Sequence, residues 1–133
     1  MVQSFNLKER TRLKSFLFSL LKKQGRPVDS LTIIFCSDKY LLDLNKSFLA
    51  HDYYTDIITF DLSESKLLTA EIYISVDRVK DNAVKFERTI KEELHRVIFH
   101  GVLHLCGYKD KSPGDQKKMR AMENQTLAAY FRP

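Results

Sequence analysis

Apolar residues recur along this chain with two spacings, and each spacing predicts a kind of secondary structure. Positions three or four residues apart predict about five helices: residues 7–24, Ser37 or Asp38 to about Phe48, a short helix from Asp77 to about Phe86, residues 89–107, and a last helix from Ser112. Short runs rich in β-branched residues predict about four strands: residues 2–5, 31–36, 57–62 and 71–76. The sequence therefore predicts an α+β fold in which a small mixed sheet is packed with helices.

Three of these elements carry signals beyond spacing. Residues Leu31–Cys36 form a short apolar run that is rich in β-branched residues and bounded by polar ones, which is typical of a strand buried on both faces. The fourth helix opens at Thr89 with a T-x-x-E capping box and is expected to end at Gly107, because glycine readily adopts the left-handed conformation of a helix C-cap. Ser112 is expected as the N-cap of the last helix, with Pro113 at its first position.

Composition narrows the class of protein. The chain has 133 residues, of which 44% are hydrophobic and 29% charged, as in an ordinary folded domain, so we expect one domain spanning residues 1–133. It has two cysteines, no recognisable signal peptide and no apolar run of the roughly 18 residues that span a membrane. These features predict a cytoplasmic protein with no membrane association, whose two cysteines are buried thiols.

Positive charge is concentrated at the two ends of the chain. The net charge is +5 over residues 1–30, −3 over residues 31–106 and +3 over residues 107–133, which sums to +5. Basic segments of this kind favour a polyanionic partner such as RNA. A solvated basic surface without a nucleic-acid partner is the alternative.

The stretch FHGVLHLCGYKD, residues 99–110, carries the candidate chemistry. On a helix, His100 and His104 project about 40° apart and lie roughly 6 Å apart along the axis, so both imidazoles can bind one metal ion. Gly107 can then reverse the chain and bring Asp110 back over the last helical turn. This H-x3-H-x5-D set predicts a site for one divalent metal at the end of the fourth helix, with an open coordination position. The alternative is that the histidines serve packing, because H-x-x-x-H also occurs by chance.

The neighbouring residues exclude other assignments. In H-E-x-x-H metalloproteases a glutamate follows the first histidine, whereas Gly101 stands there in this chain, so a peptidase of that type is excluded. Cys106 points away from His104 and is not expected to be a ligand, and His95 is expected to be packed or solvated. No general base is evident. Glu93 lies two turns before His100, but a surface or salt-bridge role is expected for it.

The same stretch resembles the signature of the YbeY family of bacterial endoribonucleases. HGVLHLCGYKD fits nine of the eleven positions of H-G-x-L-H-L-x-G-Y-D-H, two of which are open in the pattern. LNKSFLAHDYYTDIITF, residues 44–60, is similar to the family segment L-N-x-x-Y-R-x-x-D-x-x-T-D-V-L-S-F. EIYIS, Asp77 and Asn82-Ala83 resemble the strand and helix that precede the histidine helix, so the resemblance covers roughly residues 40–110.

The resemblance implies a single-strand-specific, metal-dependent endoribonuclease of ribosomal RNA maturation and ribosome quality control. It implies as partners the ribosomal RNA precursor and the small ribosomal subunit. It places the metal, zinc in the family, at His100, His104 and position 110. Candidate contacts to the RNA substrate are Thr55, Lys109 and Lys111.

Departures from the family pattern at positions 49, 109 and 110 leave the metal and the activity open. Asp110 replaces the third histidine of the family, and Lys109 replaces the aspartate before it. A carboxylate ligand is compatible with zinc, but iron, manganese and nickel are also possible. Leu49 replaces an arginine that would face the substrate. The alternatives to the nuclease are therefore a ribosome-associated RNA-binding module with a structural metal, or a metal hydrolase for another phosphoester or acyl substrate.

Overall fold

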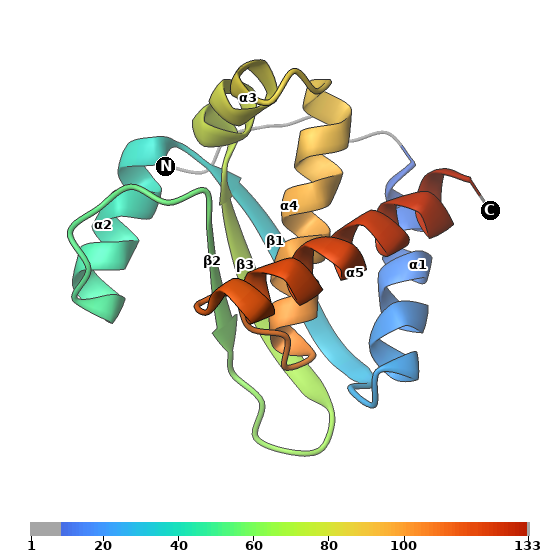
Figure 1. The fold of residues 1–133 in the computed structure, drawn as a ribbon. Helices are drawn as coiled ribbons and strands as arrows, with labels where there is room; N and C mark the ends of the chain where they lie inside the picture. Colours follow the sequence, from blue (N-terminus) through green and yellow to red (C-terminus); the bar gives the residue numbers. More distant parts are fainter. Residues whose placement is uncertain (1–8, 133) are drawn as a thin grey trace.

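A short mixed sheet lies at the centre of the structure, a computed structural model that describes residues 9–132 (Figure 1). The strands β1 (Val28–Cys36), β2 (Ile57–Asp61) and β3 (Leu68–Ser75) are arranged in the order β1-β3-β2. Strand β1 is parallel to β3, and β2 is antiparallel to β3. Within residues 9–132 five helices surround this sheet: α1 (Arg10–Lys23), α2 (Asp38–Leu49), α3 (Val76–Lys85), α4 (Ile90–Leu105) and α5 (Pro113–Phe131).

The predicted α+β fold is confirmed, with one strand fewer than expected among the described residues. The strand expected at residues 2–5 lies outside the described residues. Each of the other predicted helices and strands is present, although β1 and β3 each begin three residues earlier than expected. No helix between residues 9 and 132 combines the length and the hydrophobicity that crossing a bilayer requires.

Alternating side chains of β3 divide the hydrophobic core into two layers. One face of the strand packs against α1, α4 and α5 through the fully buried side chains of Leu68, Ala70, Ile72 and Ile74. On the opposite face Tyr73 contacts a smaller cluster that lies beneath α2 and is built on Cys36, Leu41 and Ile58. Figure 1 shows α5 crossing over α4 on the side of the sheet opposite α2.

Two burial predictions were wrong. Strand β1 was expected to be buried on both faces, but Cys36 is the only one of its nine residues that is fully buried. The reason is its position at an edge of the sheet, where β3 is its only partner strand among the described residues. Cys106 was expected to be a buried thiol, but it follows the last turn of α4 and is only half-buried.

The capping signals correctly predicted the ends of α4 and α5. The Thr89 hydroxyl accepts a hydrogen bond from the backbone N–H of Glu92 at 3.0 Å, and Ser112 accepts one from that of Asp115 at 3.1 Å. Pro113 occupies the first position of α5. Gly107 has a φ of +100°, which turns the chain back after α4.

Helix α4 lies directly on β2, and Gly101 makes this close contact possible. A Cβ atom at Gly101 would lie 2.6 Å from Cδ1 of Ile57 and 3.2 Å from Cγ2 of Thr59. These distances are shorter than van der Waals contact, so any side chain here must displace the Ile57 and Thr59 side chains of β2. The glutamate of an H-E-x-x-H motif therefore has no room at this position.

The substitution Gly101→Ala should destabilise the protein. We expect the free energy of unfolding, measured by urea denaturation, to fall by about 1–2 kcal/mol, because overpacking outweighs the gain in helix propensity. Gly114→Ala is the matched control, since a Cβ there would meet only the Ser112 hydroxyl oxygen at 4.0 Å. The control should be neutral or slightly stabilising. Equal stability of the two variants would contradict the close α4–β2 packing.

Candidate metal centre

His100 and His104 lie one turn apart on α4, with their imidazole rings nearly perpendicular. The ring centroids are 4.5 Å apart and the planes make an angle of 82°. The two Nε2 atoms are 3.0 Å apart. Both residues are half-buried and line one cavity. The helical spacing thus brings the two nitrogens together, as the sequence predicted.

Asp110 reaches the same point from the loop after α4. The positive φ of Gly107 turns the chain, and Oδ2 of Asp110 lies 3.2 Å from Nε2 of His100 and 3.2 Å from Nε2 of His104. In tetrahedral zinc sites, with donor–metal distances of about 2.0–2.1 Å, neighbouring donors lie about 3.3 Å apart. The three donor atoms therefore have the spacing that a small metal ion requires, and together they could hold one.

Hydrogen bonds at the Nδ1 atoms determine the protonation of these rings. Nδ1 of His100 lies 2.5 Å from Oε2 of Glu123, and Nδ1 of His104 lies 2.9 Å from the carbonyl oxygen of Tyr108. Both oxygens only accept hydrogen bonds, so Nδ1 of each ring carries a proton and Nε2 is the nitrogen that can donate a lone pair to a metal ion. When both rings are neutral, the two Nε2 lone pairs and the Asp110 carboxylate converge on one point. A cation satisfies such a set of acceptors.

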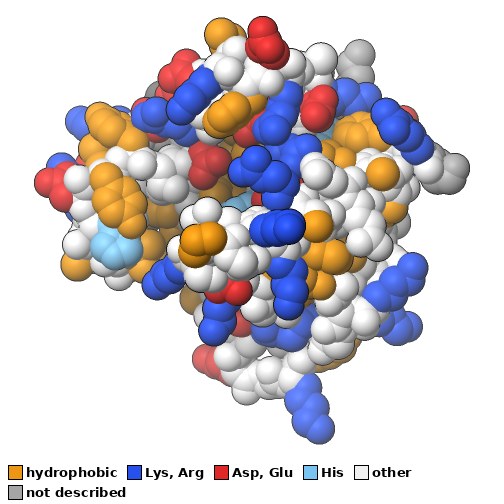
Figure 2. Space-filling view, in the orientation of Figure 1, with side chains coloured by type: hydrophobic (Ala, Val, Ile, Leu, Met, Phe, Trp, Pro, Cys, Tyr) orange, Lys and Arg blue, Asp and Glu red, His pale blue; other side chains and the backbone are white. Residues whose placement is uncertain are grey.

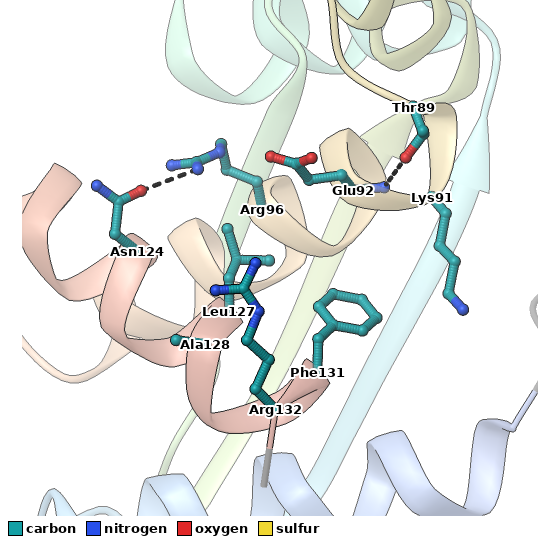
Figure 3. A pocket seen from close by; sticks show the side chains of 9 residues that line it. All are labelled: Thr89, Lys91, Glu92, Arg96, Asn124, Leu127, Ala128, Phe131 and Arg132. Atoms are coloured by element: carbon teal, nitrogen blue, oxygen red, sulfur yellow. Dashed lines mark hydrogen bonds between the residues drawn. The ribbon is translucent and has the colours of Figure 1, made fainter.

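Glu123, on α5, was not predicted as part of this site. Its carboxylate is buried and binds two partners, Nδ1 of His100 through Oε2 and Nη1 of Arg96 through Oε1 at 3.1 Å. Arg96 also donates from Nη2 to Oδ1 of Asn124 at 2.9 Å, so it bridges α4 and α5 (Figure 3). The sequence did contain a signal: Glu123 falls on the buried stripe of α5, with Met119, Leu127 and Tyr130.

The carboxylates near the site shift the pKa values of its members. Burial alone lowers the pKa of His100, but the carboxylates of Glu123, Asp110 and Asp56 outweigh burial and leave this pKa raised. Burial raises the pKa of Glu123, but its contacts with His100 and Arg96 outweigh burial and leave this pKa lowered. The pKa of Asp56 is raised, chiefly by burial. Glu123 is thus stabilised as the ionised partner that keeps the proton on Nδ1 of His100.

A cavity of about 480 Å³ opens beside the three donor atoms. Its walls come from the end of α2, from the α2–β2 connection, from β2 and from the candidate metal centre, and they include Leu49, Thr55, Asp56, His100, His104 and Asp110. Within residues 9–132, Asp56 is the one carboxylate other than Asp110 that lines the cavity. Of the three candidate substrate contacts, only Thr55 lines it. Lys109 and Lys111 lie outside the cavity and are exposed.

His95 and Glu93, which were not expected to be ligands, lie outside the group of three donor residues. His95 is buried among Phe99, Tyr130 and Phe131, with Nδ1 2.7 Å from the carbonyl oxygen of Lys91. Glu93 forms the expected salt bridge, 2.9 Å from Nη1 of Arg88, but it is buried rather than on the surface.

Comparisons with known proteins agree on one family. The family model described as Endoribonuclease YbeY matches residues 3–131. A relative from Cytophaga hutchinsonii named Endoribonuclease YbeY is 50% identical over 125 residues, which cover 93% of this chain and 87% of that protein. A relative of the same name from Phocaeicola vulgatus is 51% identical over 104 residues, which cover 78% of this chain and 75% of that protein.

A solved structure has the same fold. The solution structure of TM1509 from Thermotoga maritima matches this structure with a TM-score of 0.64 and 30% sequence identity. The match covers 95% of this chain and 85% of that chain.

Proposed function

This chain belongs to the YbeY family of endoribonucleases, and from that premise we propose that it cleaves single-stranded RNA with the help of one bound divalent metal. Its proposed place of action is ribosomal RNA maturation and ribosome quality control in the cytoplasm, on the ribosomal RNA precursor and the small ribosomal subunit. The ligands we propose are His100, His104 and Asp110. The single-stranded substrate, the metal cofactor and its three ligands are what we add to the endoribonuclease role of the family.

The convergence of three acceptor atoms beside an open cavity is the observation that carries the proposal. The Nε2 atoms of His100 and His104 and Oδ2 of Asp110 lie 3.0–3.2 Å from one another, and each Nδ1 faces an oxygen that accepts a hydrogen bond from it. Two histidines and one carboxylate leave a coordination position open, as in catalytic rather than structural zinc sites. A divalent ion there would polarise a phosphate oxygen and lower the pKa of a bound water.

The donor set favours zinc but accepts other metals. Asp110 gives a zinc complex a formal charge of +1, one unit less than three neutral histidines would. Two histidines with one carboxylate also suit ferrous iron, and carboxylates suit manganese. We therefore propose zinc as the cofactor, with iron, manganese or nickel as alternatives that metal analysis distinguishes.

Exposed cations around the site support an RNA substrate. Lys109 and Lys111 follow α4, and three further exposed cations stand on α5: Lys117, Lys118 and Arg120. Figure 2 shows Lys and Arg side chains gathered on the face that carries α5. Contacts between such side chains and phosphates make RNA binding strongly dependent on salt. In the cavity itself, the Thr55 hydroxyl and the Asp56 carboxylate are among the groups available for hydrogen bonding and proton transfer to the RNA.

The test compares three substrates of one sequence: an unstructured RNA, the same RNA in a duplex, and the corresponding DNA. We expect the purified protein to cleave the unstructured RNA, to spare the duplex and the DNA, and to lose activity with a chelator. Added metal should restore the activity. Cleavage of the duplex at the same rate would contradict the single-strand specificity, and cleavage that persists in the chelator would contradict the role of the metal.

One observation favours a second candidate, an RNA-binding module with little or no cleavage activity. Leu49 lines the cavity and is 41% exposed, so an apolar side chain stands where a phosphate-binding cation would be useful. If the metal-loaded protein binds the unstructured RNA but cleaves none of the three substrates, this second candidate replaces the nuclease.

A further inference from the structure

Two aromatic side chains are stacked on the surface beside the candidate metal centre. The rings of His51 and Tyr53 have centroids 5.0 Å apart and planes inclined by 22°. The Tyr53 hydroxyl lies 2.9 Å from Nδ1 of His51, a hydrogen bond that links the two rings. Both residues are exposed, and Tyr53 keeps 55% of its surface accessible. We call these two residues the aromatic pair.

A buried amide holds the aromatic pair in place. Asn45 is 2% exposed, and its Nδ2 donates to the carbonyl oxygen of Tyr53 at 2.9 Å. The carbonyl oxygen of Asn45 accepts from the backbone N–H of His51 at 3.1 Å. Ala50 between them has a φ of +55°, which gives the left-handed turn at the end of α2. The rings are therefore attached to a backbone that is fixed before any ligand binds.

The aromatic pair and the candidate metal centre line the same cavity. Both rings lie in the wall of the 480 Å³ cavity, as do His100, His104 and Asp110. This volume falls within the range of about 300–1,000 Å³ that is typical of small-molecule sites. Figure 2 shows histidine and hydrophobic side chains exposed together on the side of the molecule that carries α2.

The charges near the pair do not favour recognition of a phosphate there. Leu49, at the same wall, is apolar. Lys46 on the adjacent turn of α2 is paired with the Asp52 carboxylate at 3.4 Å. A ligand group that suits this part of the cavity is flat, aromatic and capable of hydrogen bonding, which describes a nucleobase.

We infer that the aromatic pair is a base-stacking subsite that binds one unpaired nucleobase of the RNA next to the candidate metal centre. This inference rests on the proposed function and adds to it the means by which a single strand is recognised. In a duplex the bases remain stacked on one another and cannot reach such a surface, whereas an unpaired base can. Base stacking also takes the place of the phosphate contact that Leu49 cannot make.

The test measures binding of two fluorescein-labelled probes at one salt concentration. The first is a short oligouridylate with 2′-O-methyl riboses, checked on a gel for integrity, and the second has the same backbone with abasic residues. The variant is Tyr53→Ala, which keeps the contact with Asn45 because that contact is made by the backbone of residue 53. Tyr53→Phe keeps the ring, and Phe86→Ala removes an exposed ring that does not line the cavity.

For Tyr53→Ala we expect the dissociation constant of the oligouridylate to rise about tenfold, with unchanged affinity for the abasic probe. Tyr53→Phe and Phe86→Ala should bind both probes as the wild type does, and all variants should keep their metal. Unchanged binding of the oligouridylate by Tyr53→Ala would overturn the subsite, and so would an equal loss of affinity for both probes. If the metal-loaded wild type fails to cleave RNA but the base-specific loss is observed, the nuclease proposal fails and the subsite stands.

Discussion

Replacement of His100 by alanine is expected to abolish both metal binding and RNA cleavage. His100 contributes one of the three donor atoms. Its Nδ1 contacts the Glu123 carboxylate, whereas Nδ1 of His104 contacts a backbone carbonyl oxygen. Loss of an outer partner of a metal ligand already costs about 10–100-fold in metal affinity, so loss of the ligand itself should cost at least about 100-fold. Metal content by mass spectrometry and cleavage of an unstructured RNA measure the two effects.

His51→Ala is the control for metal content. His51 is an exposed histidine outside the donor set, and its removal should leave the bound metal unchanged. Circular dichroism establishes that both variants are folded. A His100→Ala protein that retains its metal, or that cleaves RNA at the wild-type rate, would contradict the proposed ligand set.

The second large effect is expected for Glu123→Gln. This change keeps the size of the side chain but removes the charge that pairs with Arg96 and holds the proton on Nδ1 of His100. We expect metal affinity to fall about 10–100-fold. We also expect the metal-free protein to lose about 3 kcal/mol of unfolding free energy, because the half-buried Arg96 keeps Asn124 but loses its only carboxylate partner among the described residues. Competition with a chromophoric chelator and urea denaturation measure the two quantities.

Glu92→Gln is the matched control for this prediction. Glu92 is an exposed carboxylate in the first turn of α4, 4.0 Å from its nearest cation on Arg88. Its replacement should change neither quantity appreciably, since exposed ion pairs contribute little. Wild-type metal affinity in Glu123→Gln would show that the Glu123–His100 contact does not position the ligand.

Local sequence signals predicted most of the fold and the convergence of His100, His104 and Asp110. The capping residues Thr89 and Ser112 each bind one backbone N–H group within three residues, so their effect is visible in a short window of sequence. The donor atoms are equally local, because ten residues separate His100 from Asp110 and one glycine turn joins the helix to the loop. Local geometry was therefore enough to predict that these atoms meet.

Features that depend on distant contacts were missed. The position of β1 at an edge follows from the strand order, which apolar runs do not encode. Glu123 reaches His100 from a helix 23 residues further along the chain, and its one local signal was a charge on an apolar stripe. The aromatic pair lies in a connection without periodicity, where hydrogen bonds between Asn45 and the backbone of residues 51 and 53 hold it in place.

The most direct test of the central claim is a titration of metal-depleted protein with zinc, in which cleavage of an unstructured RNA is followed for the wild type and for Asp110→Asn. The account predicts no cleavage without metal and an activity that rises until about one ion is bound per chain. Asp110→Asn should need far more zinc for the same activity, because the amide is a weaker ligand than the carboxylate. Full cleavage by the metal-depleted wild type, or identical titrations for the two proteins, would contradict a catalytic metal held by His100, His104 and Asp110.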